Sequence, residues 1–286
     1  MPELKALYQP NTLAEAQALL EEHGERARPL AGGTSLTRSR SAKVEVLVDL
    51  SRVGLDRITR ADDGLHIGAM VRCSQLRRFL QGDPPSALYD AAGAVGSRIL
   101  QNHVTVGGNC VMVYSWSDLP VALCAMEATF VIQGRGRRSM AADAFLGAHP
   151  TRSLAEGELL VEVVVPPPQA GVGSAHLKFG RNEADQALAS ASVQVELADG
   201  VARQARIVVG AVRGLPQLLM EASDALVGKE PDPQNLSMAA AVAGREAKVS
   251  SDFKASGEYR SQLVSSLVED ALQLAMDRGS RAGDRR

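Results

Sequence analysis

The sequence predicts an α+β fold built in two parts, and three observations support this prediction. The chain has 286 residues, which is enough for two domains with buried cores. A proline run at 166–168, followed by Gly171-Val172-Gly173, interrupts regular structure and marks the candidate boundary. Beyond it, strand-like segments precede helix-like segments, a pattern typical of helices that cover one face of an antiparallel sheet. We therefore expect one domain over residues 1–172 and a second over 173–286.

In the first part, the first predicted helix covers residues 13–23. Thr12 and Glu15 have the spacing of a capping box, and Gly24 provides a stop signal at the other end. Residues 44–50 carry valine or leucine at every second position, which indicates a half-buried strand. The remaining predicted elements are strands at 65–70, 128–133 and 159–165 and helices at 74–80, 84–92 and 120–126.

In the second part, the apolar pattern predicts a small α+β domain whose antiparallel sheet has three strands. The predicted strands are residues 175–180, 187–197 and 204–213. The predicted helices that follow are residues 215–227, 235–247 and 257–277. Short turns join the three strands, so neighbouring strands are expected to pair in sequence order.

The overall composition excludes several classes of protein. A formal net charge of -2 gives no electrostatic reason to expect nucleic acid or an anionic membrane as a partner. Cys73, Cys110 and Cys124 are odd in number and widely spaced, which argues against disulfides, a zinc site or an iron–sulfur cluster held by this chain alone. We expect no metal ligands here, and free thiols of this kind are typical of a reducing compartment.

No apolar run approaches the ~20 residues that cross a bilayer, so no membrane span is expected. The start, Met-Pro-Glu-Leu-Lys-Ala-Leu, lacks the basic-then-apolar pattern of a signal peptide. These features predict a cytoplasmic protein.

Two glycine pairs are the most informative motifs of the chain. Leu30-Ala31-Gly32-Gly33-Thr34-Ser35-Leu36 and Thr105-Val106-Gly107-Gly108-Asn109 each place paired glycines between apolar and small polar residues. Glycine reaches positive φ and lets the backbone approach a ligand, and successive N–H groups in such a turn can bind a phosphate. Together the two turns suggest a cofactor whose pyrophosphate is held from both sides, with Asp118 placed to bind a ribose hydroxyl.

Each of these features also has a purely structural interpretation. A single Gly-Gly pair is commonly just a tight connection, and Asp118, before Leu119-Pro120, has the position of a helix N-cap.

Other catalytic patterns are missing from the sequence. It contains no complete Gly-x-Gly-x-x-Gly, Walker A, His-Glu-x-x-His or Gly-x-Ser-x-Gly motif, and its five histidines have no ligand spacing. A hydrolase or metalloenzyme is therefore not indicated, and no residue is assigned a catalytic acid or base role.

Five short segments, spread from the first to the second part, resemble the FAD-binding subunit of molybdenum hydroxylases, the xanthine dehydrogenase and aerobic carbon monoxide dehydrogenase family. They are Ala31-Gly32-Gly33-Thr34-Ser35-Leu36, Thr105-Val106-Gly107-Gly108-Asn109, Ser117-Asp118-Leu119-Pro120, Lys178 with Arg181 and Asp185, and Ser251-Asp252-Phe253-Lys254-Ala255-Ser256-Gly257-Glu258-Tyr259-Arg260. The resemblance implies a two-part FAD-binding domain of the vanillyl-alcohol oxidase (PCMH) type, followed by the small C-terminal domain of these flavoproteins.

The resemblance also implies which residues contact FAD. They are Leu30, Ala31, Gly32, Gly33, Thr34, Ser35, Leu36, Val95, Thr105, Val106, Gly107, Gly108, Asn109, Val111, Asp118, Leu160 and Lys178. In this scheme the amides of residues 31–35 hold the pyrophosphate and residues 105–109 close over the cofactor. Lys178 near the flavin can stabilise negative charge on the reduced ring. The alternative for Lys178 is a solvated charge on a strand.

The chain departs from the family pattern at several positions, among them Leu100-Gln101-Asn102, where the family commonly has Ile-Arg-Asn. Several members carry a tyrosine after the aspartate of the second domain, where this chain has Gln186. Trp116, the only tryptophan, replaces a small residue before Asp118 and is interpreted either as a packing residue or as a partner contact.

By the same resemblance, a large partner subunit would hold a molybdenum cofactor and a small one would hold [2Fe–2S] clusters. The chain would take electrons from these clusters and pass them to an acceptor such as NAD, oxygen or a quinone. Two alternatives remain: a stand-alone FAD-dependent reductase or oxidase on the same fold, and a scaffold that binds partners without flavin.

Overall fold

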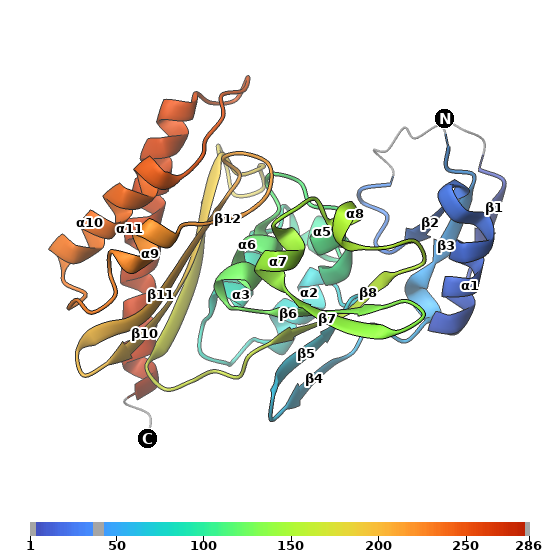
Figure 1. The fold of residues 1–286 in the computed structure, drawn as a ribbon, viewed down its shortest axis with the longest axis horizontal. Helices are drawn as coiled ribbons and strands as arrows, with labels where there is room; N and C mark the ends of the chain where they lie inside the picture. The colour runs from blue at the N-terminus through green and yellow to red at the C-terminus, as the bar shows by residue number, and fades with distance from the viewer. Residues whose placement is uncertain (1–3, 37–42, 284–286) are drawn as a thin grey trace.

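The computed structural model describes residues 4–36 and 43–283. Figure 1 shows the chain extended along one axis, with helices α10 (Pro233–Glu246) and α11 (Gly257–Gly283) at one end and helix α1 (Leu13–His23) at the other. Between them lie two larger sheets and a group of short helices. Within these described residues, no helix combines the length and the apolar character that crossing a membrane requires.

A small parallel sheet forms the N-terminal end of the molecule. Its three strands run in the order β1-β3-β2 and are β1 (Ala6–Tyr8), β2 (Ala27–Leu30) and β3 (Val46–Asp49). Helix α1 begins as predicted: the Thr12 hydroxyl accepts a hydrogen bond from the Glu15 N–H at 3.1 Å. Its buried residues Ala16 and Leu20 pack with Val46 and Val48 of the sheet.

A five-stranded antiparallel sheet follows, in the order β4-β5-β8-β6-β7. The strands are β4 (Ile58–Ala61), β5 (Gly64–Gly68), β6 (Thr129–Gln133), β7 (Arg137–Ala141) and β8 (Leu159–Val165). Successive side chains of a strand point to opposite faces. Phe130 and Val131, successive residues of β6, therefore pack into the helical core and toward α1 respectively. In β8, Val161 packs toward α1 and Val163 into the helical core, because the pairing of β6 with β8 contains a register shift that interrupts the alternation.

Among the described residues of the first part, seven short helices and two 3-10 turns complete the fold. They are α2 (Cys73–Phe79), α3 (Ala87–Ala94), α4 (Arg98–Gln101), α5 (Val106–Val111), α6 (Asp118–Ala125), α7 (Ala142–Leu146), α8 (Pro150–Ser153), η1 (Gly24–Arg26) and η2 (Leu50–Arg52). Helix α6 is buried along its whole length, because it lies between the core of the first part and the C-terminal sheet. A Cβ atom on Gly210 would lie 2.5 Å from the Val121 side chain, so only glycine permits this close packing.

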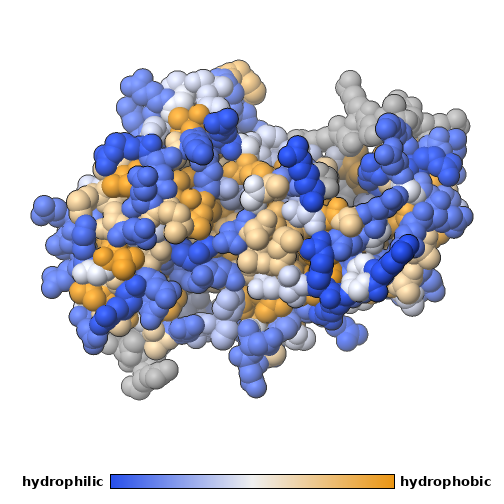
Figure 2. Space-filling view, in the orientation of Figure 1, coloured by the Kyte–Doolittle hydropathy of each residue, from blue (hydrophilic) through white to orange (hydrophobic). Residues whose placement is uncertain are grey.

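The C-terminal part is a four-stranded antiparallel sheet covered on one face by helices (Figure 1). The strands, in the order β12-β11-β10-β9, are β9 (Val172–Phe179), β10 (Ala189–Ala198), β11 (Val201–Gly210) and β12 (Gln217–Leu218). Helices α9 (Met220–Asp224), α10 and α11 bury their apolar residues against it. Figure 2 shows hydrophilic side chains over the accessible face of the molecule, with apolar side chains scattered among them.

The predicted number of strands in this sheet is wrong: the sheet has four, because β12 pairs with the end of β11. The helix predicted over 215–227 is also wrong at its start, where Pro216 and β12 precede the short α9. The other predicted helices and strands are present at similar positions, and α11 continues beyond the predicted end at 277.

Candidate functional site

A cavity of about 360 Å³ lies where the loop after β2, helix α5 and the β9–β10 loop meet. Its volume is in the range of small-molecule sites, which is about 300–1,000 Å³. The predicted site residues that line it are Ala31, Gly32, Gly33, Thr34, Ser35, Leu36, Val95, Thr105, Gly107, Gly108, Asn109, Val111, Asp118, Leu160 and Lys178. The structure thus brings together residues that lie far apart in the chain, from residue 31 to residue 178.

Two predicted residues do not line the cavity. Leu30 is the last residue of β2, and Val106 is fully buried in the core with its N–H bonded to the Val71 carbonyl at 2.8 Å. Both flank residues that do line it, so their contribution is to the shape of the two turns.

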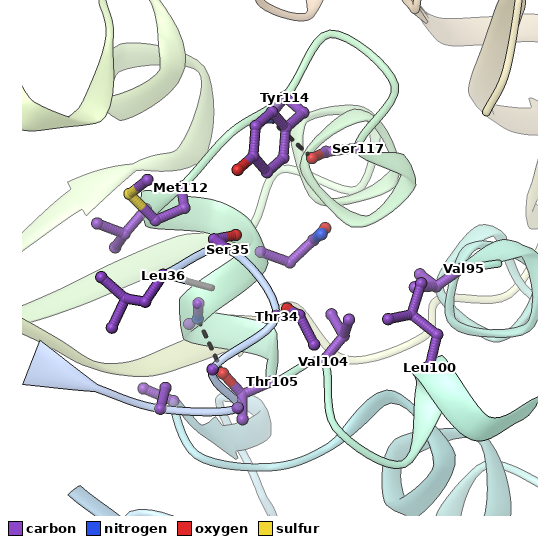
Figure 3. A pocket seen from close by; sticks show the side chains of 18 of the residues that line it. Thr34, Ser35, Leu36, Val95, Leu100, Val104, Thr105, Met112, Tyr114 and Ser117 are labelled. Atoms are coloured by element: carbon purple, nitrogen blue, oxygen red, sulfur yellow. Dashed lines mark hydrogen bonds between the residues drawn. The ribbon is translucent and has the colours of Figure 1, made fainter. Parts of the chain in front are cut away.

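The first glycine turn requires glycine at both positions, for different reasons. A Cβ atom on Gly32 would lie 1.7 Å from the His103 carbonyl oxygen, so the turn can pack there only without a side chain. Gly33 has φ of +73°, a conformation that residues with a β-branched side chain rarely adopt. Figure 3 shows the following residues, Thr34, Ser35 and Leu36, beside the wall formed by Thr105 and Val104.

The backbone N–H groups of this turn are available to a ligand. Within residues 4–36 and 43–283, no protein acceptor lies within hydrogen-bond distance of the N–H of Gly32, Gly33 or Ser35. Unpaired N–H groups gathered in one turn form a concavity that suits an anion. This part of the sequence interpretation therefore agrees with the geometry.

The second glycine pair has a different structure from the one predicted, because it forms the first turn of α5. Its N–H groups all have protein acceptors: Val106 with Val71 O at 2.8 Å, Gly107 with Ala69 O at 2.9 Å, Gly108 with Thr105 Oγ1 at 3.1 Å and Asn109 with Thr105 O at 2.9 Å. Interpreting this pair as a second phosphate-binding turn is therefore wrong. Gly107 is required by packing instead, since its Cβ would lie 2.6 Å from the Ala69 side chain.

Asn109 lines the cavity and carries an unpaired polar atom. Its Oδ1 atom is buried and, among the described residues, has no hydrogen-bond partner. Leaving such an acceptor unpaired costs about 1–3 kcal/mol. A cofactor with hydrogen-bond donors would satisfy it, so the residues present fit a polar group bound here.

Asp118 is the first residue of α6, and its carboxylate faces the cavity. Its Oδ1 lies 3.2 Å from His176 Nε2, and His176 Nδ1 lies 2.7 Å from the Ser192 hydroxyl. A carboxylate only accepts hydrogen bonds, so Nε2 carries the hydrogen and, in the neutral ring, Nδ1 accepts from Ser192. The N-cap of α6 is Ser117, so the interpretation of Asp118 as the cap is wrong.

The contact with His176 could not be predicted from sequence spacing, because the two residues are 58 positions apart. His176 and Lys178 are alternate residues of β9, which places both on the face toward the first part. Ser192 is fully buried, so this Ser–His–Asp arrangement offers no accessible nucleophile and fixes the orientation of Asp118 instead.

Lys178 is bound to the walls of the cavity and is not a solvated charge. Its Nζ donates to the Ala94 carbonyl and lies 3.4 Å from the Asp185 carbonyl. Backbone carbonyls leave the positive charge unneutralised, so the cavity keeps a cationic group on this side. Val95, labelled in Figure 3, lies at the end of α3 close to Ala94.

Several lining residues were missed by the sequence interpretation. They are mainly in the loop that follows α5 and the loop that follows β9, and include Leu100, Met112, Tyr114, Trp116, Ser117, Leu154, Glu158, Asp185 and Gln186. Tyr114 and Trp116 stack with ring centroids 4.9 Å apart. Figure 3 shows Tyr114 close to Ser117, whose hydroxyl accepts a hydrogen bond from the Tyr114 N–H at 3.1 Å. Some of them carried a signal in the sequence, since Asp185 is part of the resemblance and Gln186 and Trp116 depart from the family pattern.

The three cysteines are buried free thiols. Burial raises the pKa of Cys73 and of Cys124 to about 12, so neither thiol ionises near neutral pH. Among the described residues, no group of three histidines, cysteines or carboxylates is placed to hold a metal ion.

Glu158, at the edge of the cavity, is held by Arg138. The Arg138 Nε and Nη2 atoms donate to its two carboxylate oxygens at 2.8 and 2.6 Å, a bidentate arrangement. The Ala155 N–H donates to the same carboxylate at 2.8 Å. The Arg138 hydrogen bonds lower the pKa of Glu158 from 4.5 to about 2.

Arg138→Met is expected to raise the pKa of Glu158 and to lower the free energy of unfolding at neutral pH by about 1–2 kcal/mol. Because the folded-state pKa is depressed, this stabilisation is complete above pH 4.5 and disappears as the pH falls toward about 2. Urea unfolding of both proteins at about pH 7, 5 and 3 should show the difference shrinking. A difference independent of pH would mean that Arg138 acts through its stem and its hydrogen bond to the Ser153 carbonyl, and not through Glu158.

Comparison with known proteins shows matches over nearly the whole chain. A model of the FAD-binding domain in molybdopterin dehydrogenase matches residues 3–168, and a model of the CO dehydrogenase flavoprotein C-terminal domain matches residues 174–275. The carbon monoxide dehydrogenase medium chain of Afipia carboxidovorans is 32% identical over 280 residues, covering 95% of this chain and 96% of that protein. The 6-hydroxypseudooxynicotine dehydrogenase complex subunit alpha of Paenarthrobacter nicotinovorans is 30% identical, covering 94% and 93%.

A solved structure of carbon monoxide dehydrogenase from Hydrogenophaga pseudoflava matches with a TM-score of 0.91 and 30% identity, covering 97% of this chain and 99% of that chain. These matches confirm the predicted fold class, a two-part FAD-binding domain followed by a small C-terminal α+β domain, apart from the strand count corrected above. The chain therefore belongs to the family of FAD-binding subunits of molybdopterin dehydrogenases, with a C-terminal domain of the CO dehydrogenase flavoprotein type.

Proposed function

We propose that this chain is the electron-transfer subunit of a molybdenum hydroxylase complex and that the cavity described above holds its FAD. One observation carries the proposal: Gly32, Gly33 and Ser35, whose amides have no protein acceptor among the described residues, line one cavity together with Asn109 and Asp118. The similarity to carbon monoxide dehydrogenase medium chains along nearly the whole chain supports the same role.

Each group of residues would have a separate task. The N–H groups of Gly32, Gly33 and Ser35 would bind the pyrophosphate, and Asn109 Oδ1 would accept a hydrogen bond from the cofactor. Asp118 would accept one from a cofactor hydroxyl while His176 fixes the carboxylate. FAD supplies the redox chemistry when it is bound. Lys178 would place positive charge where it favours the arrival of electrons.

The rest of the complex follows from the family. A large subunit would carry the molybdenum cofactor and hydroxylate an organic substrate, and a small subunit with [2Fe–2S] clusters would deliver electrons to this chain. The acceptor would be NAD, oxygen or a quinone. We place the domain boundary at 172/173 and the complex in the cytoplasm, where free thiols such as Cys73, Cys110 and Cys124 stay reduced.

The test is a visible absorption spectrum of the chain purified from its native host with its complexes intact, together with metal analysis and identification of the released cofactor. FAD with iron, molybdenum and two further subunits is the expected result. FAD without partners would support the stand-alone reductase or oxidase instead. A colourless protein would contradict flavin binding altogether.

Asp118→Ala is expected to weaken FAD binding without abolishing it. The variant loses one charge-assisted hydrogen bond to the cofactor, which corresponds to about 1–3 kcal/mol, or roughly a 5- to 150-fold rise in Kd. Titration of the apo-protein with FAD, followed by fluorescence, measures the change.

Asp143→Ala is the matched control, because Asp143 is also an aspartate in the first turn of a short helix but does not line the cavity. Its Kd for FAD should equal that of the unmodified chain. An unchanged Kd in Asp118→Ala would show that Asp118 does not contact the cofactor.

A further inference from the structure

The segment Ser251–Arg260, singled out in the sequence, has no task in the proposed function and does not line the cavity. It nevertheless contacts two loops that do. One is the loop after α5, which carries Trp116, and the other is the β9–β10 loop, which carries Gln186. These loops belong to different halves of the molecule.

Lys254 makes both contacts with one side chain. Its Nζ donates a hydrogen bond to Gln186 Oε1 and lies 5.4 Å from the centre of the Trp116 ring. An ammonium group at this distance from an indole ring is attracted by the ring electrons. The Trp116 ring is itself held in place, since it stacks on the Tyr114 ring.

The backbone that carries Lys254 is anchored independently of these loops. Asp252 Oδ1 accepts hydrogen bonds from the N–H groups of Lys254 and Ala255 at 2.8 and 3.1 Å. Asp252 Oδ2 accepts from Arg260 Nη2 at 2.8 Å, and Arg260 lies on the long helix α11. The position of the Lys254 backbone is therefore set by the C-terminal domain.

The two cavity loops are also connected to this segment through their backbones. The Ala211 N–H donates to the Ser115 carbonyl at 2.7 Å, next to Trp116. Arg260 Nη1 donates to the Ala211 carbonyl and to the Leu188 carbonyl, two residues after Gln186. Residues 251–260, which are anchored on α11, therefore connect to both cavity loops. Arg260 does so through hydrogen bonds to backbone carbonyls, and Lys254 does so through the side chains of Gln186 and Trp116.

We propose that Lys254 is a positioning residue that holds Gln186 and Trp116 together across the two halves of the molecule and so closes the cavity around the bound cofactor. Release of the cofactor would then require the Lys254 contacts to break. The inference rests on the proposed placement of FAD in this cavity. It gives the Ser251–Arg260 segment a function in cofactor retention.

Trp116 makes the test direct, because it is the only tryptophan of the chain. Its emission reports on the cavity wall both with and without FAD. The variants are Lys254→Met, which keeps the stem but removes the ammonium group, and Lys254→Arg, which keeps a charged donor and the contact with the ring. Lys248→Met is the matched control, since Lys248 is an exposed lysine nearby whose side chain has no partner among the described residues.

Three measurements on the full chain are compared. They are iodide quenching of Trp116 in the apo-protein, the dissociation rate of FAD, and the midpoint of thermal unfolding. We expect Lys254→Met to increase iodide quenching and to release FAD roughly tenfold faster. Lys254→Arg should restore both values, Lys248→Met should change neither, and the thermal midpoint of the apo-protein should stay the same in all variants.

The outcomes separate this inference from the proposed function. If FAD leaves the Trp116 emission of the unmodified chain unchanged, the placement of the cofactor is wrong and the inference fails with it. If FAD quenches Trp116 but Lys254→Met releases FAD at the unmodified rate, only the role of Lys254 is overturned. Equal effects of Lys254→Met and Lys248→Met would overturn it as well, because they would reflect net charge alone.

Discussion

Gly33→Val is expected to abolish retention of FAD while the chain still folds. Gly33 has φ of +73°, and a built Cβ meets only the Leu30 side chain, at 3.6 Å. The valine therefore has room on the protein side, and its branched side chain would occupy the turn whose free amides face the cavity. The strain of this backbone conformation adds a loss of stability of about 1–3 kcal/mol.

Gly54→Val is the control that separates the loss of FAD binding from the loss of stability caused by backbone strain. Gly54 has φ of +78°, nothing lies within 4 Å of its built Cβ, and it is not part of the cavity. Both variants should lose similar free energy of unfolding in urea, but only Gly33→Val should be purified without FAD. Stoichiometric FAD in Gly33→Val would show that another part of the chain binds the pyrophosphate.

The elements that could be predicted are those whose local signals agree with their burial. Helix α1 has a hydrogen-bonded cap at Thr12, and β8, a run of leucine and valine interrupted only by Glu162, begins and ends where the sequence indicates. Helix α11 has a regular apolar face that packs on the C-terminal sheet. In these segments the periodicity of the sequence directly reflects the packing.

The elements that were missed lie at sheet edges or are very short. Strand β7 alternates between exposed and half-buried residues, and β4 is mostly exposed, so neither has an apolar pattern to detect. Strand β12 has two residues and exists only because β11 offers a free edge. Pairing of this kind depends on the partner strand more than on the segment itself.

The candidate site likewise contains features that could be predicted from the sequence and features that could not. The first glycine turn could be predicted, because the positive φ of Gly33 is a local requirement that only the neighbouring residues impose, although Gly32 is required by packing on the distant His103 carbonyl. The second pair misled the interpretation, since packing of Gly107 on Ala69 demands glycine as strongly as a phosphate would. The partners of Asp118 and Lys254 come from distant strands and loops, and no motif specifies them.

Arg260→Met is expected to cause the largest loss of stability, about 3–5 kcal/mol. Arg260 is only 3% exposed, and its guanidinium group donates to the Leu188 and Ala211 carbonyls as well as to Asp252. Methionine fills a similar volume but leaves both carbonyls without this donor in the protein interior. Urea unfolding, monitored by the emission of Trp116, measures the loss.

Asp252→Ala distinguishes the ion pair from the bonds to the carbonyls. The Asp252 side chain is 45% exposed, so water can replace part of what the variant removes, and Arg260 keeps both carbonyl partners. We therefore expect Asp252→Ala to cost only about 1–2 kcal/mol, clearly less than Arg260→Met. If the two variants lost the same free energy of unfolding, the hydrogen bonds from Arg260 to the Leu188 and Ala211 carbonyls would contribute nothing to stability. The ion pair between Arg260 and Asp252 would then account for the whole effect.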